Sequence, residues 1–210
     1  TQAAGLSLKW FRDNLAECYK EEAEKQGVDS YDLINQDVEN VPIGSRRLLY
    51  LPYLMGERTP HLNPNCRGVF FGLSAIHTKA DMLRAVMEGV SYSLSDCLDI
   101  LREMQVDVSE MMACGGGGKS KIWRQMLADM YGCEVKTIKA QEGPALGVAI
   151  LAGVGAGIFN DVQSACRQFI AQETYCQPEP ASKAYYEKGH ALYKKLYVQL
   201  KDCYEELAQL

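Results

Sequence analysis

Four consecutive glycines, Gly115 to Gly118, followed by Lys119 and Ser120, form the pattern in this chain with the clearest chemical use. Glycines carry no side chain, so backbone N–H groups in such a run can approach an anion closely. A helix that starts directly afterwards adds unpaired donors and the positive end of its dipole. The glycines alone fit equally well a phosphate or nucleotide site and a tight strand-to-helix turn in which Ser120 is the N-cap.

Two well-known phosphate-binding patterns do not match these glycines. The P-loop pattern G-x-x-x-x-G-K-[ST] requires glycine at position 113, where this chain has Ala113. The dinucleotide pattern G-x-G-x-x-G would require glycine at Ser120, or at Asn160 for the later pair of glycines. A P-loop NTPase is therefore a remote alternative.

Strands alternating with helices must position the glycine turn. A short strand precedes it and an amphipathic helix follows it, and the alternation predicts an α/β domain with a helix-covered sheet. An uncharged segment near residues 143–160 contains five glycines and begins with Gly-Pro, which favours a buried helix over a membrane span. The predicted strands are 48–54, 69–73, 109–114 and 134–138, and the predicted helices are 5–24, 30–40, 78–104, 120–131, 144–151, 161–170 and 185–210, with a linker over 175–182.

Composition limits the class of protein. The chain has 210 residues, 47% hydrophobic and 23% charged, which fits one large soluble domain with appendages. Its net charge of −5 gives no overall attraction to nucleic acid or to an anionic membrane. No two of its eight cysteines are spaced as C-x-x-C, so we expect buried thiols in a reducing compartment. No signal peptide opens the sequence, and we expect a cytoplasmic protein.

Several stretches resemble one enzyme family. GGGGKSKIWRQMLADMYGCEV and QEGPALGVAILAGVGAGIF are similar to the C-terminal region of FGGY-family carbohydrate kinases. So are LPYLMGERTPHLNPNCRGVFFGLS and LRAVMEGVSYSLSD, and GERTPH resembles the xylulokinase members in particular. The resemblance implies an actin-like ATPase (ribonuclease H-like) fold with a helix-covered mixed sheet. It also implies an ATP-binding domain over residues 1–175, with a linker and helix over 176–210 packed on it.

The resemblance also implies site residues and cofactors. Gly116 and Gly117 would approach the phosphates of ATP, Ser120 would lie by the adenosine, and Gly5 and Lys9 would line the adenine pocket. Lys9 replaces the Gln of related glycerol kinases, so a solvated lysine is an equal alternative. Mg²⁺ would accompany ATP. We expect the catalytic Asp and most sugar contacts upstream of Thr1, and no catalytic or metal-binding residue within the chain.

The expected activity is phosphorylation of D-xylulose to D-xylulose 5-phosphate by the full-length protein, with the 210-residue chain inactive alone. A kinase of ribulose, gluconate or glycerol, and a non-catalytic nucleotide-sensing or assembly module, stay open. Self-association as a homodimer stays open too. Five further side chains receive structural interpretations: Trp123 as a packing anchor, Glu57 and Arg58 as a mutual ion pair, Glu88 as a member of a buried ion pair, and His61 as a loop residue.

Overall fold

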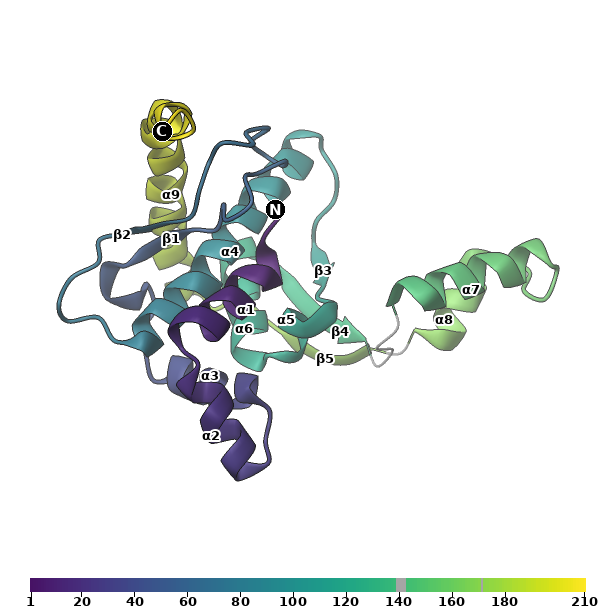
Figure 1. The fold of residues 1–210 in the computed structure, drawn as a ribbon. Helices are drawn as coiled ribbons and strands as arrows, with labels where there is room; N and C mark the ends of the chain where they lie inside the picture. Colours follow the sequence, from purple (N-terminus) through teal and green to yellow (C-terminus); the bar gives the residue numbers. More distant parts are fainter. Residues whose placement is uncertain (139–142, 171) are drawn as a thin grey trace.

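The computed structural model describes residues 1–138, 143–170 and 172–210. Helices and short strands alternate along the chain (Figure 1). The helices are α1 Ala4–Leu15, α2 Cys18–Gln26, α3 Ser30–Glu39, α4 Lys79–Glu103, α5 Gly115–Lys119, α6 Lys121–Tyr131, α7 Gly143–Gly155, α8 Val162–Phe169 and α9 Pro180–Leu207, with a 3-10 turn at Ser45–Arg47. The strands are β1 Leu49–Leu51, β2 Val69–Phe71, β3 Glu110–Met112, β4 Glu134–Ile138 and β5 Gln172–Cys176.

The described strands form two sheets. In the larger one the order is β3-β4-β5, with β3 parallel and β5 antiparallel to β4, so the sheet is mixed as predicted. Met111 is opposite Val135, and Val135 is opposite Cys176. The parallel pair is connected through α5 and α6, which is the crossover that parallel strands need. Strands β1 and β2 form a separate antiparallel pair.

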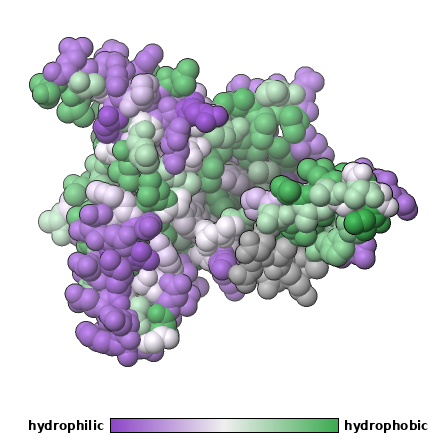
Figure 2. All heavy atoms as spheres, turned by 45° about the vertical axis from the view of Figure 1, so that its right-hand side comes forward, coloured by the Kyte–Doolittle hydropathy of each residue, from purple (hydrophilic) through white to green (hydrophobic). Residues whose placement is uncertain are grey.

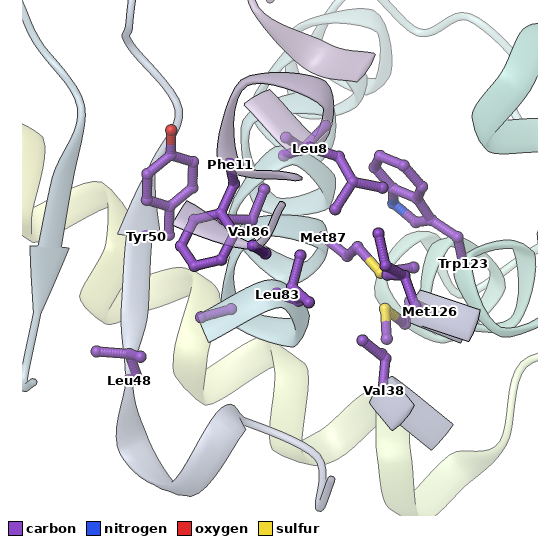
Figure 3. Close-up of a cluster of buried hydrophobic side chains, with 14 of the residues drawn as sticks. Leu8, Phe11, Val38, Leu48, Tyr50, Leu83, Val86, Met87, Trp123 and Met126 are labelled. Carbon is purple, nitrogen blue, oxygen red and sulfur yellow. The ribbon is translucent and has the colours of Figure 1, made fainter. Parts of the chain in front are cut away.

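The central helix α4 carries most of the core. Side chains from α1, α3, α6 and β1 meet it in one apolar cluster (Figure 3). Gly89, in the middle of α4, allows β1 to pass close by, because a Cβ there would lie 2.1 Å from the carbonyl oxygen of Tyr50. The interior glycine thus permits the close approach of β1 to α4. The labelled members of the cluster are Leu8, Phe11, Val38, Leu48, Tyr50, Leu83, Val86, Met87, Trp123 and Met126.

The last helix, α9, belongs to the same packed body. Its tyrosines Tyr186, Tyr193 and Tyr197 are buried against β1 and α4. Each phenol ring buries a large apolar area, and these rings recur along α9, so they stabilise the packing of this helix on β1 and α4. The predicted C-terminal helix is therefore present, although it begins at Pro180 rather than at residue 185.

The structure corrects four predicted elements. The helix over 5–24 is divided into α1 and α2 around Ala16, and the strand over 48–54 is limited to Leu49–Leu51. The first two residues of the predicted linker, Tyr175 and Cys176, belong to β5, which pairs with β4. The four glycines belong to a short helix, α5, rather than to a tight turn between strand and helix, and among them only Gly115 has a positive φ.

The uncharged helix α7 differs most from its predicted environment. It pairs with α8 in a helical hairpin that extends from the body (Figure 1). The side chains of Val148 and Leu151 are exposed, whereas Ile150 is buried. The prediction that this helix is buried is thus wrong for most of its surface. In the described chain, only α8 and the turn between the two helices cover α7. Gln141 and Glu142 of the QEGPALG stretch lie outside the described residues.

Two expectations about chemistry are also resolved. All eight cysteines are free thiols, but the expectation that they are buried is wrong for Cys18, Cys114 and Cys203, which are exposed. Among the described residues, no helix combines the length and the apolar character that crossing a membrane requires.

Candidate functional site

A cavity of about 410 Å³ opens beside the glycines, at the carboxyl end of β3. Gly5 from α1, Gly116 and Gly117 from α5, and Trp123 from α6 all line it. The remaining lining residues are mostly apolar and come from α1, α4, β3, α6 and β4: Ala4, Val90, Leu94, Met111, Met112, Ala113, Cys114, Gly118, Leu127, Tyr131 and Val135. Three of the five predicted site residues are therefore brought together across a separation of more than a hundred residues.

The glycines give this cavity its open edge. A Cβ at Gly116 would meet nothing within 4 Å, and a Cβ at Gly117 would touch the Trp123 ring at 3.4 Å. Gly118 faces inward instead, since its Cβ would lie 2.7 Å from the carbonyl oxygen of Ala113. The backbone of Gly116 and Gly117 is consequently accessible from the cavity, while Gly118 fits the turn against β3.

Arg124 and Trp123, both on α6, contact the glycine turn and stabilise it. The Arg124 guanidinium donates to the carbonyl oxygens of Gly118, at 2.6 Å, and Lys119, at 3.0 Å. These bonds satisfy carbonyls at the end of α5 that have no partner within so short a helix. Trp123 Nε1 donates to Ser91 Oγ at 3.0 Å, which connects the floor of the cavity to α4. Trp123 is thus the packing anchor that the sequence predicts.

Ser120 and Lys9 do not line the cavity. The Ser120 hydroxyl accepts a hydrogen bond from the Trp123 backbone N–H at 3.2 Å and donates one to Asn35 Oδ1 at 2.8 Å. This is the N-cap role, which satisfies an orphan donor of α6. Lys9 is exposed on α1, one helical turn after Gly5. Contact of Ser120 and Lys9 with a nucleotide stays a prediction.

The lining of the cavity is mostly apolar, which suits an uncharged ligand group. None of the residues that line it is charged. Burial raises the pKa of Tyr131 well above its ordinary value, so that its hydroxyl stays neutral at physiological pH. An aromatic base would fit the apolar wall, and phosphate oxygens would fit the N–H groups of the glycines.

Sequence reasoning missed the contributions of Arg124 and Asn35. Arg124 follows Ser120 by four residues, a spacing that places it one helical turn further on and gives a weak signal for a capping contact. Asn35 lies 85 positions before Ser120 and has no such signal. The expected ion pair between Glu57 and Arg58 is wrong: Glu57 is buried and instead accepts hydrogen bonds from Thr1 Oγ1, the Gln2 N–H and the Arg58 N–H.

The fold defines an α/β domain of the actin-like ATPase class, in which a glycine turn borders a cavity of about 410 Å³. Residues 1–156 match the model of the FGGY family of carbohydrate kinases, C-terminal domain, and the chain belongs to this family. It is 37% identical over 207 residues to a xylulose kinase of Staphylococcus epidermidis, covering 99% of this chain and 40% of that protein. It is 36% identical over 182 residues to a gluconokinase of Bacillus subtilis, covering 86% of this chain and 36% of that protein.

A solved structure agrees with these relatives. The ligand-bound xylulose kinase from Lactobacillus acidophilus superimposes with a TM-score of 0.83 at 30% identity, covering 97% of this chain and 39% of that one. The chain thus spans about two fifths of the length of the relatives that it matches. The family resemblance inferred from the glycine turn and the GERTPH stretch is confirmed.

Proposed function

We propose that this chain is the ATP-binding domain of a sugar kinase that converts D-xylulose to D-xylulose 5-phosphate. The observation that carries the proposal is the convergence of Gly5, Gly116 and Gly117 on one apolar cavity. Close packing of a protein interior gives no reason for these two distant elements, α1 and α5, to leave an opening of about 410 Å³ between them and their neighbours.

In this proposal the backbone N–H groups of Gly116 and Gly117 receive phosphate oxygens, and the apolar wall near Gly5 receives the adenine. Mg²⁺ would neutralise the phosphates when bound with ATP. A kinase of this kind needs a general base that takes the proton from the attacking sugar hydroxyl. No acidic side chain lines the cavity, so we assign the base and most of the sugar contacts to sequence outside these 210 residues.

The preference for D-xylulose rests on the xylulose kinases among the relatives and on the GERTPH stretch, Gly56 to His61. The gluconokinase relatives support a second candidate substrate, D-gluconate. A non-catalytic nucleotide-sensing module is a third candidate, and it would bind ATP without turnover.

A substrate panel tests this proposal. ATP-dependent phosphorylation of D-xylulose, D-ribulose, D-gluconate and glycerol is measured for a protein that joins this chain to the N-terminal half of the Staphylococcus epidermidis relative. We expect the highest kcat/KM with D-xylulose and no turnover by the 210-residue chain alone. Preference for D-gluconate would overturn the substrate, and ATP binding without turnover of any sugar would favour the sensing module.

A further inference from the structure

The described part of the chain buries two arginine side chains, and only one of them has a counter-charge. Arg84 is 6% exposed, and its Nε atom is 2.9 Å from Glu88 Oε1. Arg124 is 9% exposed, and no carboxylate of the described residues lies within 4.0 Å of its guanidinium. A buried cation without a partner is costly, because water no longer solvates it. The packing of the described chain therefore does not account for the burial of the charge on Arg124.

The guanidinium of Arg124 is fixed against the glycine turn. Its Nη1 atom donates to the carbonyl oxygens of Gly118 at 2.6 Å and Lys119 at 3.0 Å. Both carbonyls belong to the C-terminal end of α5. The Nε atom of Arg124 is buried and has no hydrogen-bond partner in the described chain. The two carbonyls carry only partial negative charges, so most of the positive charge of Arg124 has no compensation among the described residues.

The position of Arg124 on α6 increases this imbalance. Ser120 is the N-cap of α6, and the Arg124 N–H donates to the Ser120 carbonyl oxygen at 3.0 Å, which closes the first turn. The first turn of a helix carries the positive end of the helix dipole, where anions are stabilised and cations are destabilised. The dipole of α6 therefore opposes a cation in this turn. An anion bound beside the turn would offset both the dipole and the buried charge.

The sequence around the glycine turn adds positive charge and no negative charge. Between Glu110 and Asp129 there is no Asp or Glu, whereas Lys119, Lys121 and Arg124 are basic. Lys119 and Lys121 are exposed, and neither has a carboxylate of the described residues within 4.0 Å. This segment is positively charged in a chain whose net charge is −5. A polyanion fits such a local field.

Arg124 is close enough to influence a phosphate at the open edge of the cavity. Helix α5 has five residues and rises about 1.5 Å per residue, so it is about 7 Å long. Gly116 and Gly117 lie within this length of the carbonyls that Arg124 binds. The Debye length is about 8 Å at physiological ionic strength, so salt does not fully screen the charge over this distance. Arg124 does not line the cavity, so it would act through α5 and through its electric field.

We propose that Arg124 is a positioning residue for the polyphosphate of ATP. Its hydrogen bonds to Gly118 and Lys119 hold α5 so that the backbone N–H groups of Gly116 and Gly117 face the phosphates, and the phosphates provide the missing counter-charge. This inference rests on the proposed function, because it requires a nucleotide in the glycine cavity. It adds that Arg124 strengthens binding of the phosphates alone, so adenosine gains nothing from it.

Calorimetric titrations of the 210-residue chain with Mg²⁺-ATP and with adenosine, at low and at high NaCl concentration, test the proposal. We expect Arg124→Met to weaken ATP binding at least about 10-fold and to leave the affinity for adenosine unchanged. Arg124→Lys keeps the charge and should recover most of the ATP affinity. Added NaCl should weaken ATP binding by wild type more than ATP binding by Arg124→Met, a difference that a merely structural role would not produce.

Arg67→Met is the matched control. Arg67 Nη1 also donates to two backbone carbonyl oxygens, those of Pro64 and Cys66, each at 2.8 Å, but it lies in the loop between β1 and β2 and does not line the cavity. We expect this variant to bind both ligands as wild type does. Circular dichroism verifies folding. If Arg124→Met fails to fold, Arg124→Gln replaces it, because the amide can still donate a hydrogen bond but carries no charge.

The outcomes separate this proposal from the proposed function. Unchanged ATP affinity in a folded Arg124→Met chain, with wild type binding both ligands, would overturn the role of Arg124 and leave the nucleotide site intact. Equal losses of affinity for ATP and adenosine would also overturn it, because Arg124 would then only stabilise the fold. If the folded wild-type chain binds neither ligand, the nucleotide site itself is wrong, and the role of Arg124 is overturned with it.

Discussion

At the residue scale, Gly116 and Gly118 lie in the same short helix but differ in how much space a side chain would find. A Cβ at Gly118 would meet the backbone of Ala113 at 2.7 Å, whereas a Cβ at Gly116 would meet open space. We expect Gly118→Ala to lower the free energy of unfolding by about 1–3 kcal/mol, because a backbone contact cannot turn aside. Gly116→Ala should leave it unchanged or raise it by up to about 1 kcal/mol. Urea unfolding of both variants measures this, and equal effects would contradict the geometry of α5.

Glu88 shows what a buried charge requires. Its carboxylate accepts hydrogen bonds from Arg84 Nε, the Gly44 N–H and Ser45 Oγ, each at 2.9 Å, and from the Tyr186 hydroxyl at 3.0 Å. The expectation that Glu88 belongs to a buried ion pair is confirmed by its contact with Arg84.

Glu88→Ala should therefore destabilise the chain strongly. The variant leaves the buried Arg84 guanidinium without its counter-charge, and we expect a loss of about 3–5 kcal/mol in the free energy of unfolding. Adding Arg84→Met to the same chain should cost less than the sum of the two single changes, because the unpaired charge is then removed. Chemical unfolding of the double-mutant cycle measures the coupling, and simple additivity would contradict it.

His61 shows the limit of sequence reasoning at this scale. It lies in the loop between β1 and β2, and its Nε2 atom is 3.8 Å from Asp96 Oδ2. Nothing near it in the sequence predicts this partner, since Asp96 lies 35 positions later on α4. The ion pair of Glu88 was easier to predict, because a charge inside an apolar helix requires a partner, and Arg84 lies one turn before Glu88.

At the scale of elements, α4 begins with a capping box. The Asp81 carboxylate accepts hydrogen bonds from the Thr78 N–H at 2.8 Å and the Thr78 hydroxyl at 2.6 Å. Burial opposes ionisation of Asp81, but the bonds from Thr78 and the charge of Arg46 outweigh it, and the pKa of Asp81 lies below its ordinary value of 3.8. The unfolded chain therefore binds this proton at a higher pH than the folded chain does.

The capping box predicts a pH dependence with a definite sign. The stabilisation from Asp81 should be complete well above pH 3.8 and should decrease as the pH falls through 3.8 toward the lower pKa of the folded state. Asp81→Asn should be less stable than wild type by about 1 kcal/mol at pH 7. The difference should shrink below pH 4. Urea unfolding between pH 7 and pH 2.5 measures it, and a constant difference would contradict the shift.

The α7–α8 hairpin allows a second test at this scale. Ile150 is 3% exposed and Leu151 is 62% exposed, although the two are neighbours in one apolar helix. Figure 2 shows the apolar surface of this hairpin at the right of the view. We expect Leu151→Asp to change the free energy of unfolding by at most about 0.5 kcal/mol and to reduce any self-association. Ile150→Asp should destabilise the hairpin, because it buries an unpaired charge.

Thermal unfolding and light scattering of these two variants provide the measurement. Strong destabilisation by Leu151→Asp would contradict the exposed position of α7 and would indicate that this helix packs on the body.

The helical character of α7 was predictable from Pro144, and the strands that precede it along the chain were predictable from the spacing of their apolar residues. Its exposure was not, because an all-apolar helix gives no indication of which face is covered. Strand β5 was missed because it lies next to a proline-containing linker, and its pairing with β4 is a long-range contact.

At the scale of the whole molecule, the fold class was predictable from the alternation of strands and helices, and the family from the motifs. The cavity was only partly predictable. Gly116 and Gly117 belong to a visible motif, but the approach of Gly5 depends on how α1 packs on α4 in the core of Figure 3. The resemblance implies nucleotide contacts for Ser120 and Lys9, while the structure gives Ser120 a capping role and places both residues outside the lining of the cavity. The boundary between residues 175 and 176 stays a prediction, and both residues belong to β5.

The central claim is that the glycine cavity holds a nucleotide, and calorimetric titration of the 210-residue chain with Mg²⁺-ATP tests it most directly. Gly117→Arg fills the cavity edge, and Gly155→Arg is the matched control, since a Cβ at Gly155 meets open space at the end of α7. We expect saturable 1:1 binding by wild type and by Gly155→Arg, and at least about 10-fold weaker binding by Gly117→Arg. Equal affinity in all three proteins, or no binding by a folded wild-type chain, would contradict the account.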